Sequence, residues 1–248
     1  MAWKYIVALA GALAAAGAAA ADYGTQPELV ASAPERSRFF MWEGEVARED
    51  FLLGADRKAP LVIHLHGCAG IHPYSDLSFI RALREKSINV MAPDFLARGD
   101  ATTSCPSGRP EPLGHPETSN PRRIEARRLE MERVIAWARE QGFQRIWVTG
   151  HSEGGRVVQG VRAGVSGVIA IGMDCKNTAF WQPNPGNKVH VFVSHRDPWL
   201  GWPGAPVRGC GSPWDSSTMH WTNEPSHEPL ADPAWKDEYL RLILDEPS

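Results

Sequence analysis

One short motif constrains the fold of this chain more than any other feature. Residues 150–155 read Gly-His-Ser-Glu-Gly-Gly, after an apolar run at 143–149 and before a segment that can continue as a helix. The pattern GxSxG between a strand and a helix is typical of a nucleophile elbow, a tight turn that raises a serine hydroxyl above a sheet. Its presence makes acyl transfer the leading hypothesis. Because a glycine-rich turn that merely contains serine fits the same five residues, the rest of the chain has to decide.

The first residues have the pattern of a secretory signal peptide. Lys4 precedes an apolar stretch at residues 5–16, and small residues at Ala19 and Ala21 fit an AxA cleavage site. We expect cleavage after Ala21 or one residue earlier. The apolar core is short for a membrane span, which disfavours the alternative of an uncleaved anchor. The predicted location of the mature protein is therefore the periplasm or the outside of the cell.

The remainder of the chain, residues 22–248, has the length of one α/β domain with a sizeable core. Neither a repeat nor a domain boundary is visible in it. The formal net charge of the whole chain is −3, and removal of Lys4 with the leader makes it one unit more acidic. This charge implies neither nucleic acid nor an anionic membrane surface as a partner. The oligomeric state is not predicted.

The chain has 4 cysteines, at Cys68, Cys105, Cys175 and Cys210. In an oxidising compartment an even number of cysteines predicts disulfides, here two, with three possible pairings. Pairing of Cys68 with Cys105 and of Cys175 with Cys210 is favoured because each bond would link neighbouring segments. On the chain-entropy model each would stabilise the fold by roughly 3–4 kcal/mol. Metal ligation by these cysteines is disfavoured, since none forms a CxxC pair.

Apolar runs and helical spacings alternate along the chain. Expected strands lie at residues 61–65, 89–92, 143–149, 165–173 and 188–193, and expected helices at residues 76–86, 120–142, 153–163 and 235–244. This alternation predicts an α/β fold with a mostly parallel, doubly wound sheet covered by helices on both faces. Residues 38–46 and 51–53 are candidates for antiparallel edge strands. The proline-rich stretch 94–121 is predicted to be a surface loop that flanks the site.

A nucleophilic serine needs a histidine base, and the histidine needs a carboxylate that fixes its tautomer. In the chain order Ser, acid, His, the acid should follow a later strand, and Asp197 lies just after residues 188–193. The histidine should precede the last helix, as His227 does. Asp174 is the rival for the acid and His220 for the base. The sequence thus predicts Ser152, Asp197 and His227 as catalytic residues.

Acyl transfer also needs two backbone N–H groups that face the developing oxyanion. The residue after the nucleophile, Glu153, should supply one, and Cys68 in the glycine-bearing loop 66–70 should supply the other. A disulfide at Cys68 would stiffen that loop. His64 and His66 form an HxH pair, a pattern found in zinc sites, but no third ligand follows at close range and a glycine comes next. We therefore expect no metal and no cofactor.

Three motifs together resemble the α/β-hydrolase superfamily. They are His-Gly-Cys-Ala-Gly at 66–70, Ala-Pro-Asp-Phe at 92–95 with Arg98-Gly99 beyond it, and the elbow at 150–155. The chain looks most like the dienelactone-hydrolase-like branch, over residues from about Phe39 to the last helix. The resemblance implies the α/β-hydrolase fold. Dienelactone hydrolase itself has cysteine as its nucleophile, whereas this chain has Ser152, which favours an exported esterase over a cytosolic lactone-cleaving enzyme.

The functional expectation is a serine hydrolase that cleaves a small carboxylic ester through an acyl-enzyme intermediate. A peptidase or amidase with the same triad and a non-catalytic binding protein with the same fold are the alternatives. Tryptophans gather late in the chain, where loops should frame the site, at Trp181, Trp199, Trp202, Trp214, Trp221 and Trp235. Their rings would suit an apolar acyl group, an aromatic ester or a sugar face, or would give a long loop its own small core.

Overall fold

The computed structural model describes residues 39–41, 44–46, 55–68, 70–71, 76–93, 121–173, 184–200 and 219–245. The predicted signal peptide, the candidate strand at 51–53 and most of the predicted loop 94–121 lie outside these residues. Within the described residues, no helix has the length and apolar character needed to cross a membrane.

The fold is built on one 8-stranded sheet with the order β2-β1-β4-β3-β5-β6-β7-β8. The strands are β1 (Phe39–Met41), β2 (Gly44–Val46), β3 (Leu61–Leu65), β4 (Asn89–Pro93), β5 (Ile146–His151), β6 (Gly167–Ile171), β7 (Val189–Ser194) and β8 (Met219–Thr222). From β4 to β8 all neighbouring strands are parallel, and β1 pairs antiparallel with β2 and β4. The predicted mostly parallel sheet with an antiparallel edge is confirmed.

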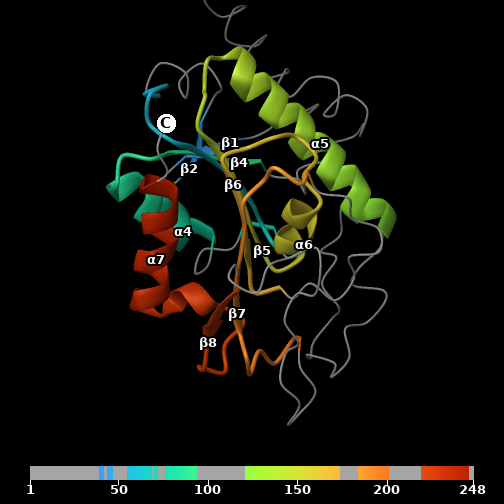
Figure 1. Ribbon diagram of the computed structural model, residues 1–248, viewed down its shortest axis with the longest axis vertical. Coiled ribbons are helices and arrows are strands. Elements are labelled where there is room, and N and C mark those ends of the chain that lie inside the picture. The colour runs from blue at the N-terminus through green and yellow to red at the C-terminus, as the bar shows by residue number, and fades with distance from the viewer. Residues whose placement is uncertain are drawn as a thin grey trace, which may run out of the picture.

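Helices cover both faces of the sheet. They are α4 (Asp76–Glu85), α5 (Pro121–Glu140), α6 (Glu153–Gln159) and α7 (Pro233–Leu244), with a short 3-10 turn η6 (Pro229–Ala231) before α7. Figure 1 shows α4 and α7 on one side of the sheet and α5 and α6 on the other. Successive residues of β3 alternate between the two cores: Ile63 packs with the α5 and α6 side, and Val62 with the α4 and α7 side. The doubly wound arrangement is confirmed.

The predicted bounds of three elements need correction, and one strand was not predicted. The elbow strand begins at Ile146 rather than Phe143, because Phe143 donates its N–H to Ala138 at the end of α5 and fills the core there. Helix α6 ends at Gln159, before the predicted residue 163, and the next strand spans only Gly167–Ile171 instead of residues 165–173. Strand β8 was not predicted, since most of its residues are only half-buried and form no apolar run.

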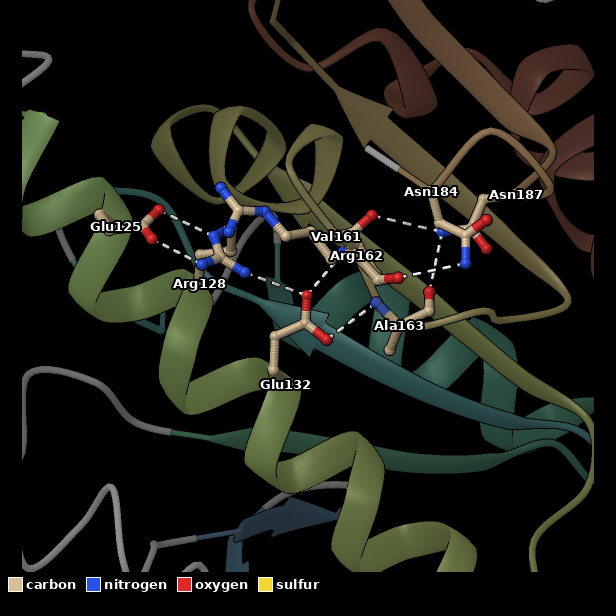
Figure 2. A network of polar contacts seen from close by, with 8 residues as sticks. All are labelled: Glu125, Arg128, Glu132, Val161, Arg162, Ala163, Asn184 and Asn187. Atoms are coloured by element: carbon tan, nitrogen blue, oxygen red, sulfur yellow. Dashed lines mark hydrogen bonds and ion pairs between the residues drawn. The ribbon is translucent and has the colours of Figure 1, made fainter. Parts of the chain in front are cut away.

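A polar network ties α5 to the turn that follows α6 (Figure 2). The carboxylate of Glu132 accepts hydrogen bonds from the backbone N–H groups of Arg162 at 2.6 Å and Ala163 at 2.9 Å. From the other side, Asn187 donates to the Ala163 carbonyl at 3.0 Å and accepts from Val165 N–H at 2.9 Å. Side chains from α5 and from the turn before β7 thus satisfy backbone groups of Arg162, Ala163 and Val165 in the irregular turn between α6 and β6.

Candidate active site

Ser152 occupies the turn between β5 and α6 with φ of 52° and ψ of −118°. This positive φ is unfavourable for a residue with a side chain. The turn is held to the sheet by a hydrogen bond of 2.8 Å from Ser152 N–H to the Ile171 carbonyl. A Cβ atom at Gly154 would lie 2.2 Å from the Leu65 carbonyl oxygen, and one at Gly150 would lie 2.4 Å from the Gly154 backbone. The motif glycines are therefore required by close backbone contacts.

Asp197 and His227 form a hydrogen-bonded pair. Asp197 follows β7 and is buried, and its Oδ2 accepts from His227 Nδ1 at 2.8 Å. Its Oδ1 accepts from the backbone N–H of Trp199 at 2.8 Å. Because a carboxylate oxygen accepts hydrogen bonds, we assign Nδ1 of His227 as the donor, which leaves Nε2 as the ring nitrogen that can accept a proton. The pair has the relation that a general base and its orienting acid require.

The loop that carries His227 lies against the elbow. His151, the residue before Ser152, donates from Nε2 to the His227 carbonyl at 3.1 Å, and the two rings are 5.1 Å apart between centroids. A Cβ atom at Gly172, just after β6, would lie 2.5 Å from the same carbonyl oxygen. Burial, followed by the charge of His227, lowers the pKa of His151 to about 3. A neutral His151 ring therefore fixes the His227 backbone next to Ser152.

Glu228 is a second acidic group at the elbow that the sequence analysis missed. Its Oε2 lies 3.3 Å from His151 Nε2. Burial, with a smaller contribution from Asp76 and Asp197 against the opposing effect of His227, raises the pKa of Glu228 to about 7. The only signal in the sequence was its place directly after His227.

The loop after β3 lies against Ser152. A Cβ atom at Gly67 would lie 3.3 Å from Cβ of Ser152, and Gly67 forms an antiparallel bridge with Gly70. His66 donates from Nδ1 to the Gly67 carbonyl at 2.7 Å. Since the N–H and C=O of a trans peptide point in opposite directions, this contact also fixes the direction of the Cys68 N–H. Burial, followed by the charge of Arg127, lowers the pKa of His66 to about 3, so the ring is neutral.

Cys68 itself is disulfide-bonded. The other cysteines, Cys105, Cys175 and Cys210, lie outside the described residues. The favoured pairing therefore stays a prediction.

His64, the other member of the HxH pair, has a structural environment. Its Nδ1 contacts Thr149 Oγ1 and its Nε2 contacts Asp76 Oδ1, each at 2.8 Å, and the side chain is fully buried. Both ring nitrogens of His64 thus have partners inside the protein. Across the described part of the chain, no group of three or more His, Cys, Asp or Glu side chains is arranged to hold a metal ion.

The rival for the catalytic base lies elsewhere in the sheet. Nε2 of His220 on β8 lies 3.1 Å from Nδ1 of His190. The His220 ring stacks on Phe192, with 4.3 Å between the ring centroids. It therefore belongs to the packing between the sheet and α7, while His227 contacts Asp197. The rival acid, Asp174, lies outside the described residues.

The predicted aromatic residues divide between the site and the core. Trp199 is 38% exposed, and its ring centroid is 5.7 Å from that of His227. Trp221 stacks on His195 at 4.1 Å, and Trp235 packs edge-on against Phe192 on the α7 side. The remaining late tryptophans, Trp181, Trp202 and Trp214, lie outside the described residues. Of the described late tryptophans, Trp199 is the one whose ring lies beside His227.

No known family model and no curated protein matches this sequence at a significant level. Solved structures resemble it in fold. A Thermus thermophilus protein is 16% identical, with 78% of this chain and 92% of that chain covered and a TM-score of 0.51. An α/β serine hydrolase without a lid from Xanthomonas campestris is 17% identical, with 85% and 89% covered and a TM-score of 0.49. A Klebsiella pneumoniae protein with the provisional name dienelactone hydrolase is 14% identical, with 76% and 88% covered and a TM-score of 0.49.

Proposed function

We propose that this chain, which has the α/β-hydrolase fold, is a serine hydrolase that cleaves a small carboxylic ester. The observation that carries the proposal is the hydrogen bond of 2.8 Å between His227 and a buried Asp197, on a loop fastened to the elbow of Ser152. A serine at an elbow of this kind, with a histidine and its orienting carboxylate on a loop that contacts the elbow, supports acyl transfer.

In the proposed reaction, Ser152 Oγ attacks the ester carbonyl carbon while His227 Nε2 takes the hydroxyl proton. The negative charge that forms on the carbonyl oxygen is held by the backbone N–H groups of Glu153 and Cys68. Collapse of the tetrahedral intermediate breaks the bond to the alcohol, which leaves with the proton from His227. A water molecule, deprotonated by His227, then attacks the acyl-enzyme and releases the carboxylic acid and Ser152.

The surroundings of His227 support an apolar or aromatic portion in the substrate. The exposed ring of Trp199 lies beside His227. An exposed tryptophan at a site is suited to contact with an apolar group, because its large ring buries much area at little entropic cost. We assign this contact to the part of the ester that lies on the His227 side of Ser152.

We also place the mature protein in the periplasm or outside the cell, on the pattern of residues 1–21. N-terminal sequencing of the exported protein should begin at Asp22, or at Ala21 if cleavage falls one residue earlier. A start at Met1 would contradict this part of the proposal.

The test is steady-state turnover of p-nitrophenyl esters of increasing acyl length, an acetylated sugar and matched p-nitroanilides. Wild-type protein should cleave esters faster than anilides, and Ser152→Ala should lower kcat by at least about 10³-fold. The matched control is Ser87→Ala, because Ser87 has a similar φ of 58° but lies at the end of α4. Faster anilide cleavage would favour the amidase alternative, and a wild type that turns over no substrate would favour a binding protein.

A further inference from the structure

Arg127 on α5 reaches from its helix to two segments of the candidate active site. Its side chain is only 5% exposed. One terminal nitrogen, Nη1, donates to Glu153 Oε1 at 2.6 Å, and the other, Nη2, donates to the His66 carbonyl at 2.6 Å. A single buried guanidinium thus bridges the first residue of α6 and the end of β3.

These two segments carry the N–H groups that the proposed reaction uses for the oxyanion. The Glu153 side chain is anchored on Arg127, and the backbone N–H of the same residue is one donor. On the other side, Arg127 fixes the His66–Gly67 peptide through its carbonyl, and the His66 ring fixes the next peptide, which carries the Cys68 N–H. Both donors are therefore one or two peptide units from a group that Arg127 holds.

The chemistry of arginine suits this bridging role better than a purely stabilising one. A buried ion pair contributes little to stability compared with apolar packing, because both charges lose their hydration. The planar guanidinium, however, presents its donors at fixed angles and so sets the separation of two acceptors. Lysine could offer only a point charge at the same place.

We propose that Arg127 is a positioning residue that sets the distance between the two oxyanion-hole amides of Glu153 and Cys68. This inference rests on the proposed function. It assigns to Arg127 an effect on the transition state, where the oxyanion exists, rather than on the binding of the neutral ester.

The adjacent residue supplies a matched control. Arg128 is also 5% exposed and ion-paired, but its partners are Glu125 at 2.6 Å and Glu132 at 3.2 Å within α5. Figure 2 shows the Arg128 guanidinium between the carboxylates of Glu125 and Glu132. The same substitution at either position therefore removes a buried, ion-paired arginine. Only the substitution at residue 127 removes one that contacts the candidate site.

The experiment compares Arg127→Lys and Arg128→Lys in the full chain. We expect Arg127→Lys to lower kcat by roughly 10- to 100-fold, with KM within about 2-fold of the wild-type value. The affinity for a trifluoromethyl ketone inhibitor, whose adduct carries an oxyanion, should fall by a similar factor. Arg128→Lys should lower the melting temperature. Its kcat, calculated per folded molecule, should stay within about 2-fold of the wild-type value. Equal kcat and equal inhibitor affinity in the two variants would overturn the role of Arg127.

If Arg127→Lys does not fold, Glu153→Gln takes its place, because the amide keeps an oxygen acceptor but loses the charge that holds the guanidinium. Its kcat should then fall while KM stays constant, and an unchanged kcat would overturn the proposal. Wild-type protein without ester turnover overturns the proposed function together with the role of Arg127. Active wild type with an equally active Arg127→Lys variant overturns the role of Arg127 alone.

Discussion

At the scale of single residues, the candidate site combines a strained backbone at Ser152 with the hydrogen-bonded pair of Asp197 and His227. Among the described non-glycine residues, only Ser87 and Ser152 have positive φ. Ser87 follows a helix end, a common place for this conformation. Ser152 adopts it at the end of a strand, where the hydrogen bond to Ile171 and the packed glycines impose it. Strain of this kind is typical of functional turns.

Asp197→Asn tests the role of the buried carboxylate. The amide can keep the contact with Trp199 N–H through its oxygen, but its NH₂ group would face His227 Nδ1 and favour the wrong histidine tautomer. We expect kcat for the best ester to fall by roughly 10³- to 10⁴-fold with little change in KM. The measurement is steady-state kinetics at pH 7.5 or above. A kcat within 10-fold of wild type would show that Asp197 does not orient the base.

Some residues of the candidate site could be predicted from sequence motifs, and others could not. Ser152, Glu153 and Cys68 stand in motifs, and Asp197 and His227 stand at expected places after strands. Arg127 could not be predicted, because its two partners are 26 and 61 residues away and depend on the rotation of α5 over the sheet. The contact of His151 with the His227 carbonyl, 76 residues away, depends in the same way on tertiary packing.

At the scale of elements, apolar runs predicted the buried strands well, and half-buried segments poorly. Strand β3 has the predicted bounds Leu61–Leu65, since every residue in it is buried. Strand β8 lies at the edge of the sheet and was missed, because most of its residues are only half-buried and an edge strand needs little apolar surface. The predicted strand 143–149 began too early, because Phe143 was counted as part of its apolar run. Phe143 is buried in the core after the end of α5 and does not belong to β5.

Glu132→Gln tests how α5 is fastened to the turn after α6. The Glu132 carboxylate accepts hydrogen bonds from two backbone N–H groups. In the glutamine variant the side-chain NH₂ group would face one of these N–H groups, and two donors cannot form a hydrogen bond. We expect the free energy of unfolding to fall by about 1–3 kcal/mol. The value of kcat should stay unchanged, because the turn follows the C-terminal end of α6 and Ser152 precedes its N-terminal end. The measurement is denaturant unfolding, with Glu140→Gln at an exposed position of the same helix as the control. Equal stability of both variants would contradict the fastening role.

At the scale of the whole molecule, the fold gathers the site at one edge of the sheet. Cys68 follows β3, Ser152 follows β5, Asp197 follows β7 and His227 follows β8. These strands are parallel, so their carboxyl ends lie at the same edge, where open α/β sheets bind their ligands. The alternation of strands and helices made this gathering predictable before any contact was known.

Buried neutral histidines predict loss of stability in acid. The pKa values of His66 and His151 are lowered to about 3 and that of His190 to about 4, in each case chiefly by burial. Because the unfolded chain binds these protons near its ordinary histidine pKa of about 6.5, protons favour unfolding below that pH. The free energy of unfolding should therefore fall as the pH decreases from about 6.5 towards 4.

Glu228 affects the pH dependence of stability in the opposite direction. Its raised pKa of about 7 means that the folded protein holds this proton more tightly, so its contribution to stability is lost as the pH rises from about 4.5 to 7. Urea unfolding at several pH values should show the acid loss, and His190→Gln should make its slope shallower. A stability that is constant between pH 6.5 and 4, or an unchanged slope in the variant, would contradict this account.

Ser152 is the proposed nucleophile, and the position of a covalent adduct decides whether this assignment is right. Wild-type protein is treated with a fluorophosphonate, digested and sequenced by tandem mass spectrometry, beside Ser152→Ala and Ser87→Ala. We predict a single phosphonylated residue, Ser152, in wild type and in Ser87→Ala, and no adduct in Ser152→Ala. An adduct on another residue, or undiminished labelling of Ser152→Ala, would contradict the assignment.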